Sequence, residues 1–452
     1  MKTSKWFLIL LTIALFCCTT TVLAEGSEQP AYYDGWWMGM SQNGILNTSY
    51  ELMYDDYGTP YYSSGPFYWF DYETGIALLT CSHLECSHTQ PVNSFDDRPL
   101  LEKMNDTSVC YAWRLNEVPI TGPVMYEGKM YGISCSPDLF NETHNVGIFE
   151  MEIDGPTTQV ASLGHLFSWE QYPECTDFII YDGYAYLNVF VSKNRNLDLE
   201  RSEALGDVPP ISIIYKVSLD NGQTTELCRI SAQTCTYSLM GLVNDVLYFV
   251  QNTADGYTPL NEAASFEAWK EEYEGKLHYS LLGVNITSGE LVVLDNDLCN
   301  LTLAYGVNFE LIKDNYLYAI ILPQTAEEKY ARFVGYDLEN STCIVNYSFQ
   351  YDAENKFYPY YVLTDTTMLA LNFETGDFAL RNLQNGEITV LDIPGACIYG
   401  NDGEYYDISS VDYQPELLLL DHYHADGRRS VSYITVEELL NNGTPHDFDT
   451  LE

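Results

Sequence analysis

Short segments in which hydrophobic and polar residues alternate cover most of the chain, and turn residues separate them. In residues 211–230, ISIIYKVSLDNGQTTELCRI, alternate side chains are apolar, and the Asp220-Asn221-Gly222 unit between the two runs has the composition of a hairpin turn. A second hairpin, 178–191, turns at Asp182-Gly183. Together the two hairpins predict a four-stranded antiparallel sheet of the kind that forms one propeller blade.

The same hairpin pattern recurs at unequal intervals along the chain. Its turn is marked by Gly75, Gly155, Gly222, Gly289, Asn340, Gly386 and Gly427. A partner turn followed by an aromatic strand is found at 126–131, 181–186, 243–248, 313–318 and 401–406, and more weakly at 362–371. Propeller blades tolerate loops of any length, whereas helical solenoids keep a stricter period. We therefore predict an all-β fold, a single β-propeller with seven blades, six or eight being the alternatives.

The N-terminal segment 1–24 has the composition of a signal peptide. Two lysines precede an apolar run that ends at Cys18, and Ala24 closes a small-residue cleavage site. The apolar run is short for a membrane span, so we expect a secreted or cell-surface protein with no transmembrane span after cleavage. A lipid anchor on Cys17 or Cys18 is the alternative, but the residues before them do not fit that pattern.

Four further segments complete the expected organisation. Residues 25–54 form a leader with an aromatic part that we expect to close the ring as a strand, and the propeller is predicted over 55–440. Within it, 196–210 is predicted as an exposed loop and 261–277 as a short amphipathic helical insertion. A polar tail, 441–452, ends the chain.

Acidic residues dominate the charge of the chain. Sixty-five Asp and Glu against twenty Lys and Arg give a formal net charge of −45. Such a field repels nucleic acid and anionic membranes and favours cationic partners or metal ions. The 38 tyrosines suit a pleated surface, and a smaller share of them suits a binding face. We expect a monomer whose partner is a protein, a peptide or a carbohydrate, and not nucleic acid.

A cysteine and histidine motif lies near the start of the predicted propeller. In the run FYWFDYETGIALLTCSHLECSHTQ and the later VCYAW, Cys81, Cys86 and His88 have the spacing Cys-x4-Cys-x-His, and Cys110 and Ala112 follow as Cys-x-Ala. This motif resembles one in exported β-propeller proteins of Gram-positive anaerobes, whose blades are similar to those of TolB-like and LDL-receptor-like propellers. The resemblance implies a propeller fold and export from a Gram-positive type of bacterium, with no established activity.

Two chemistries suit this motif. Thiolates of Cys81, Cys86 and Cys110 with the imidazole of His88 make a tetrahedral ligand set for a structural zinc ion. Alternatively, export favours oxidation, with Cys81 or Cys86 joined to Cys110 in a disulfide that closes the long loop. Both readings are open at this point, as is a third in which the cluster holds neither a metal ion nor a disulfide.

A second histidine cluster lies in the segment DHYHAD. On a strand, His422 and His424 face the same side, as metal ligands do; the alternative is a polar strand end that runs into the Asp426-Gly427 turn.

No residue is assigned a catalytic role from the sequence. The chain lacks a Gly-x-Ser-x-Gly nucleophile motif, and its acids are too numerous to single out a catalytic pair. The prediction is therefore an exported binding or scaffold module at the cell surface, with a carbohydrate or a basic peptide as ligand. The alternative is a polysaccharide-active hydrolase or lyase with carboxylates at the mouth of the propeller channel.

Overall fold

In a computed structural model of the chain, the described residues are almost entirely strands and turns. The structure describes residues 31–33, 40–41, 44–54, 60–79, 81, 101–102, 105, 110, 120–139, 141–152, 156–194, 196–205, 211–231, 237–253, 268, 272, 277–295, 302–303, 307–313, 316–321, 330–350, 357–372, 374–396, 403–412, 417–426 and 428–451. The predicted signal peptide and most of the predicted helix at 261–277 lie outside these residues. Within them, no helix has the length and apolar character needed to cross a membrane.

The strands form seven sheets within this part of the chain. One contains β2 (Met40–Ser41), β3 (Gly44–Tyr54), β4 (Pro60–Asp71), β5 (Ile76–Leu79) and β31 (Asp449–Leu451). The next contains β6 (Ile120–Tyr126), β7 (Lys129–Asp138), β8 (Thr143–Met151) and β9 (Thr157–Ser162). The third contains β1 (Ala31–Tyr33), β10 (Gln171–Tyr181), β11 (Tyr184–Lys193), β12 (Ile211–Ser218) and β13 (Thr224–Ser231).

Four more sheets follow along the chain. The first contains β14 (Tyr237–Val243), β15 (Val246–Thr253), β16 (Leu277–Asn285), β17 (Leu291–Asp295) and β18 (Thr302–Leu303). The second contains β19 (Val307–Lys313), β20 (Tyr316–Ile321), β21 (Tyr330–Asp337) and β22 (Thr342–Gln350). The third contains β23 (Phe357–Val362), β24 (Thr367–Asn372), β25 (Asp377–Asn382) and β26 (Ile388–Pro394). The last contains β27 (Tyr405–Asp412), β28 (Leu417–Tyr423), β29 (Arg429–Thr435) and β30 (His446–Asp447).

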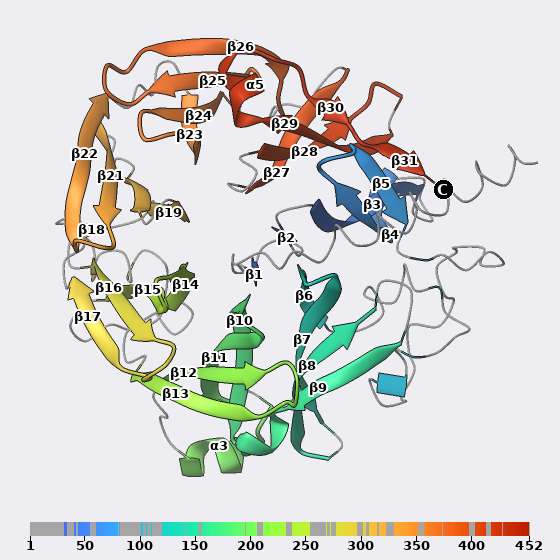
Figure 1. Ribbon diagram of the computed structural model, residues 1–452, viewed down its shortest axis with the longest axis vertical. Coiled ribbons are helices and arrows are strands. Elements are labelled where there is room, and N and C mark those ends of the chain that lie inside the picture. The colour runs from blue at the N-terminus through green and yellow to red at the C-terminus, as the bar shows by residue number, and fades with distance from the viewer. Residues whose placement is uncertain are drawn as a thin grey trace, which may run out of the picture.

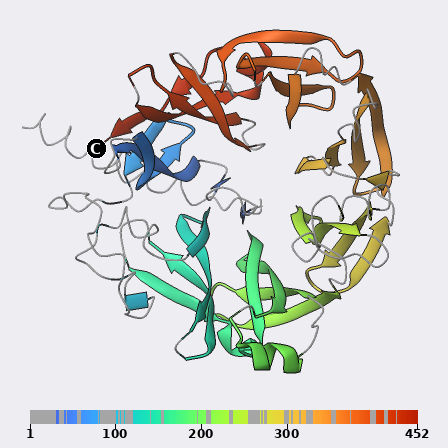
Figure 2. The ribbon, with the colours of Figure 1, turned by 180° about the vertical axis from the view of Figure 1, so that it is seen from behind.

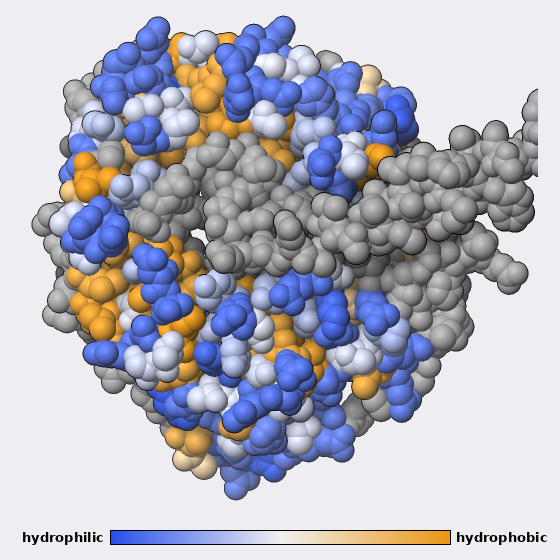
Figure 3. Space-filling view, in the orientation of Figure 1, coloured by the Kyte–Doolittle hydropathy of each residue, from blue (hydrophilic) through white to orange (hydrophobic). Residues whose placement is uncertain are grey.

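The sheets are arranged around a common centre, toward which β6, β10, β14, β19, β23 and β27 are the innermost strands of their sheets, and β1 and β2 lie inside the ring (Figures 1 and 2). Apolar side chains fill the spaces between neighbouring sheets, as between β6–β9 and β10–β13 and between β23–β26 and β27–β30. Hydrophilic residues cover much of the visible face, with hydrophobic groups between them (Figure 3). The predicted all-β propeller class is confirmed.

The C-terminal segment pairs with the N-terminal sheet. Strand β31 pairs in parallel with β5, with Asp449 opposite Ile76. Just before it, the Phe448 ring packs against Phe70 with ring centroids 5.1 Å apart. The segment expected as a polar tail thus supplies β30 to the last sheet and β31 to the N-terminal sheet. In the 25–54 segment, β2 and β3 belong to the N-terminal sheet and β1 pairs with β10.

The recurring turn joins the third and fourth strands of a sheet, as β12–β13 and β16–β17 illustrate. In the turn after β16, the Asn285 side-chain oxygen accepts the Ser288 N–H at 2.8 Å, and the Gly289 N–H donates to the Asn285 carbonyl at 2.8 Å. Asp71 accepts the Thr74 N–H in the same way at 2.8 Å. The local sequence therefore determines this turn, because an Asx side chain and a glycine satisfy its backbone groups.

The last sheet departs from the predicted turn pattern. Residues 401–406 were expected to form a turn before a second strand, but Glu404 leads directly into β27, the first strand of its sheet. The turn predicted at 425–427, of which residues 425 and 426 are described, lies between β28 and β29, the second and third strands. The third and fourth strands of this sheet, β29 and β30, are joined through α5 (Val436–Leu440) in place of the recurring turn.

Short helices occur in the connections. The 196–210 segment, expected as a loop, contains α3 (Leu199–Leu205), which Asp198 caps by accepting the Arg201 N–H at 2.8 Å. The run LERSEAL has strong helix formers, which explains why this part of the expected loop is helical. A 3₁₀ turn, η3 (Gly164–Leu166), follows β9, and α5 (Val436–Leu440) follows β29 with a capping box between Thr435 and Glu438.

Candidate metal site

One face of the last sheet changes from apolar to polar toward the end at which β27 begins. On this face Ile408 and Leu420 pack in the core shared with β23–β26. Because side chains alternate along a strand, Tyr406 on β27 and His422 on β28 lie on the same face two residues further along. Tyr406 and His422 are opposite each other in the register, and their rings stack with centroids 4.3 Å apart. The polar end of this face is therefore built beside the core.

The outer strands extend the polar group. Ser430 on β29 is opposite His422, and Asp447 on β30 is opposite Ser432. Glu404 immediately precedes β27 and reaches the same place from the inner side of the sheet. Acidic, hydroxyl and imidazole groups that are up to 43 residues apart in sequence thus come together through the strand register.

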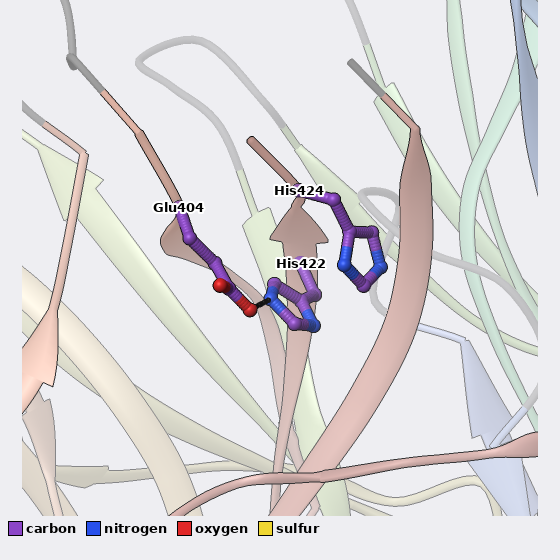
Figure 4. A group of neighbouring side chains, drawn as sticks. All are labelled: Glu404, His422 and His424. Carbon is purple, nitrogen blue, oxygen red and sulfur yellow. Dashed lines mark hydrogen bonds and ion pairs between the residues drawn. The ribbon is translucent and has the colours of Figure 1, made fainter. Parts of the chain in front are cut away.

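His422 is held by two carboxylates. Its Nε2 lies 2.5 Å from Oε1 of Glu404 (Figure 4). Its Nδ1 lies 2.8 Å from Oδ1 of Asp447. The imidazole is buried, with 5% of its side chain exposed, whereas about half of each carboxylate side chain is exposed, 53% for Glu404 and 44% for Asp447. The ring is therefore fixed in position while the acids border solvent.

His424 lies beside this pair. Its ring centroid is 3.9 Å from that of His422, and its Nε2 is 2.8 Å from the Ser430 hydroxyl. Burial, and then the neighbouring His422, lower the pKa of His424 below the ordinary value for histidine. A neutral imidazole is favoured near pH 7, which is the form that donates a lone pair to a metal ion.

Asp447 is kept ionised. Burial alone would raise its pKa, but hydrogen bonds from Ser432 and His422 outweigh burial, and the pKa is lowered. The 2.5 Å contact between Nε2 of His422 and Glu404 carries a proton, which a metal ion bound at Nε2 would displace, and an ionised Asp447 accepts the Nδ1–H of the same ring. This is the arrangement by which an outer carboxylate fixes the tautomer of a metal-binding histidine.

Together Glu404, His422 and His424 form a candidate ligand set. Ligand atoms of the three residues all lie within 4.8 Å of one another. Two imidazoles suit Zn²⁺ and the carboxylate also suits Mn²⁺, so the set fits divalent transition-metal ions of this kind. With three protein ligands, such an ion keeps coordination positions for water or another oxygen donor.

Asp447→Asn tests the outer carboxylate. We expect the affinity for Zn²⁺ to fall by about 10–100-fold, because the amide no longer fixes the tautomer and charge of His422. Isothermal titration calorimetry on chelator-treated protein measures the change. Glu437→Gln, an exposed acid on α5, is the matched control and should leave the affinity unchanged. Equal affinities for Asp447→Asn and wild type would contradict the role of Asp447.

The two sites expected from the sequence are described to different extents. Cys81 and Cys110 are buried, each 7% exposed, while Cys86 and His88 lie outside the described residues, so zinc or a disulfide there stays a prediction. At the other cluster, the expected common side of His422 and His424 is confirmed.

Sequence reasoning missed Glu404 and Asp447. Glu404 was assigned to an aromatic turn and Asp447 to the polar tail. Their signal is weak because each is one acid among 65, and only the strand register selects them.

Comparisons with known proteins give structural likenesses only. No protein-family model matches the chain, and no curated protein sequence matches it. Among solved structures, an oligogalacturonate lyase in complex with manganese is 9% identical, with a TM-score of 0.41 over 91% of this chain and 97% of that one. An oligogalacturonate lyase from Vibrio parahaemolyticus is 8% identical, with a TM-score of 0.43 over 91% and 98%.

A puromycin-hydrolysing peptidase of Mycobacterium tuberculosis is 9% identical, with a TM-score of 0.40 over 79% of this chain and 48% of that one. Similarities of this size assign no activity to this chain.

Proposed function

We propose that Glu404, His422 and His424 bind a divalent transition-metal ion, and that the protein is a metal-dependent hydrolase or lyase acting on a polysaccharide. The observation that carries the metal site is the buried His422 ring, with Asp447 at Nδ1 and Glu404 at Nε2. An ion bound there supplies a Lewis acid that polarises a substrate or water oxygen. The protein's own contribution is to fix the two imidazoles and the carboxylate around that position.

Features of the same sheet support a carbohydrate as substrate. Glu404 immediately precedes β27, the strand of its sheet that faces the centre of the ring (Figure 1). The half-buried Tyr406 ring stacks on His422 with centroids 4.3 Å apart, which places an aromatic ring with a polar tip beside the ligand set. A bound cation would also offset locally the repulsion that a net charge of −45 exerts on an acidic sugar.

A chelation and turnover experiment tests this proposal. Protein freed of metal is titrated with Zn²⁺ or Mn²⁺ by calorimetry and then assayed on neutral and uronate-containing polysaccharides. We expect turnover that chelation removes and the same ion restores. New reducing ends accompany both reactions, whereas an unsaturated, ultraviolet-absorbing uronate accompanies only the lyase reaction. Failure to bind either ion would overturn the metal site.

A metal-dependent binding module at the cell surface is the second candidate. One observation favours it: Glu404 and Asp447 both direct a carboxylate oxygen at His422, so each is already engaged rather than poised as a general base. This candidate predicts saturable, chelator-sensitive binding on glycan or basic-peptide arrays without product. Turnover on the polysaccharides would exclude it as the whole function.

A further inference from the structure

Two cysteines lie on neighbouring sheets, one on each side of the same apolar core. Cys135 is on β7 and Cys175 on β10, and both pack against the cluster that fills the space between the two sheets. Both are half-buried and both are thiols in this structure. The cysteines therefore belong to an interface between blades rather than to one blade.

Strand alternation places Cys135 at this interface. Tyr131 and Ile133 of β7 belong to the same core cluster, and Cys135 is the next residue on that face. Val146, which is opposite Cys135 on β8, belongs to the cluster as well. The thiol of Cys135 thus points toward β10.

A β-bulge turns Cys175 toward β7. Phe178 and Ile180 lie on the face of β10 that belongs to the core cluster. Strict alternation along the strand would place Cys175 on the opposite face. The register shifts between Cys175 and Asp177, so that Cys175 is opposite Val189, another member of the cluster. A bulge inserts one residue and so reverses the facing of the side chains beyond it. The irregularity has the effect of bringing the two cysteines to one interface.

Hydrogen bonds of the Cys135 thiol place it against the part of β10 that carries Cys175. Sγ of Cys135 donates to the carbonyl of Pro173 at 3.0 Å, two residues before Cys175 on β10. The backbone of Cys175 itself is a hydrogen-bond partner of the Cys135 thiol. The Cys175 thiol remains on its own strand, 3.6 Å from the Asp177 carbonyl.

We propose that Cys135 and Cys175 form a disulfide that joins the two blades when the protein folds in an oxidising compartment. The bond forms by thiol–disulfide exchange with an oxidised dithiol oxidoreductase. One cysteine thiolate attacks the oxidant's disulfide, the second displaces it, and the oxidant leaves as a dithiol with the two electrons and two protons. The crosslink closes a loop of about 40 residues and constrains the unfolded chain.

Burial affects when the crosslink can form. It raises the pKa of Cys135 to about 11 and that of Cys175 well above its ordinary value. Since the thiolate is the nucleophile, the folded dithiol reacts slowly near pH 7. Oxidation is therefore expected during folding, before the interface closes.

Peptide mapping under non-reducing conditions tests the proposal on the wild-type protein. Protein folded with a glutathione redox buffer and an oxidised dithiol oxidoreductase is denatured in excess alkylating reagent, digested and analysed by mass spectrometry. We expect one linked pair of peptides that contains Cys135 and Cys175, converted to two peptides by reduction. Alkylation of both cysteines, or a bond from either to a different cysteine, would overturn the proposal.

A melting experiment provides a second readout. Reductant should lower the Tm of wild type by about 4 °C more than that of the Cys135→Ser/Cys175→Ser variant. Cys228→Ser, at a half-buried cysteine on β13, is the control and should keep the wild-type response. If the double variant fails to fold, the peptide map of the wild type still shows whether Cys135 and Cys175 are linked.

Discussion

Replacing His422 by alanine is expected to weaken Zn²⁺ binding by more than about 100-fold, because it removes the one buried nitrogen ligand of the set. Glu404 and His424 would remain, and Asp447 would lose the ring that it orients. Two half-exposed groups cannot hold a divalent ion as tightly as three fixed ones. Calorimetry on chelator-treated protein measures the loss, and the turnover assay should show the same loss if the ion is catalytic.

His165→Ala is the matched control, since His165 is exposed on η3 and far from β28 in the chain. It should keep the wild-type affinity. Circular dichroism and the Tm show whether His422→Ala still folds, because the change leaves two carboxylates beside a small cavity. If folded His422→Ala bound Zn²⁺ like wild type, the assignment of Glu404, His422 and His424 as ligands would be wrong.

Local sequence was sufficient for the strands and for most turns of the propeller. Alternation in a run such as 211–218 decides which side chains enter the core, and an Asx residue with a glycine closes the turn from within a few residues. These interactions do not depend on distant parts of the chain. The class of fold could therefore be predicted from the repetition of one local pattern.

Features that depend on distant pairing could not be predicted in the same way. The acids around His422 were recognised only from the register of four strands, and the turn signal expected between the last two strands lies one connection earlier, because α5 joins β29 to β30. Likewise, no local signal shows that the bulge before Asp177 directs Cys175 toward β7. In each case tertiary pairing decides the chemistry of a residue whose local surroundings are ordinary.

The glycine of the recurring turn has both a local role and a role in contacts between blades. The turn between β12 and β13 places Gly222 against the preceding blade, where a Cβ on Gly222 would lie 2.2 Å from the Val160 carbonyl oxygen of β9. Gly289, in the equivalent turn of the next blade, approaches the Leu227 carbonyl of β13 in the same way, at 2.5 Å. The glycine that the turn requires thus also permits close packing of one blade on the next.

Gly222→Ala is therefore expected to lower the free energy of unfolding by about 3–5 kcal/mol. Of this, about 1–2 kcal/mol comes from the left-handed conformation, with φ of 69°, and the rest from displacing the backbone of β9. Gly386→Ala separates the two causes, because Gly386 has φ of 73° but no atom within 4 Å of its Cβ position. It should cost only about 1–2 kcal/mol. Urea denaturation followed by tryptophan fluorescence and circular dichroism measures both changes. Equal losses for the two variants would show that packing of the turn on β9 contributes nothing to the ring.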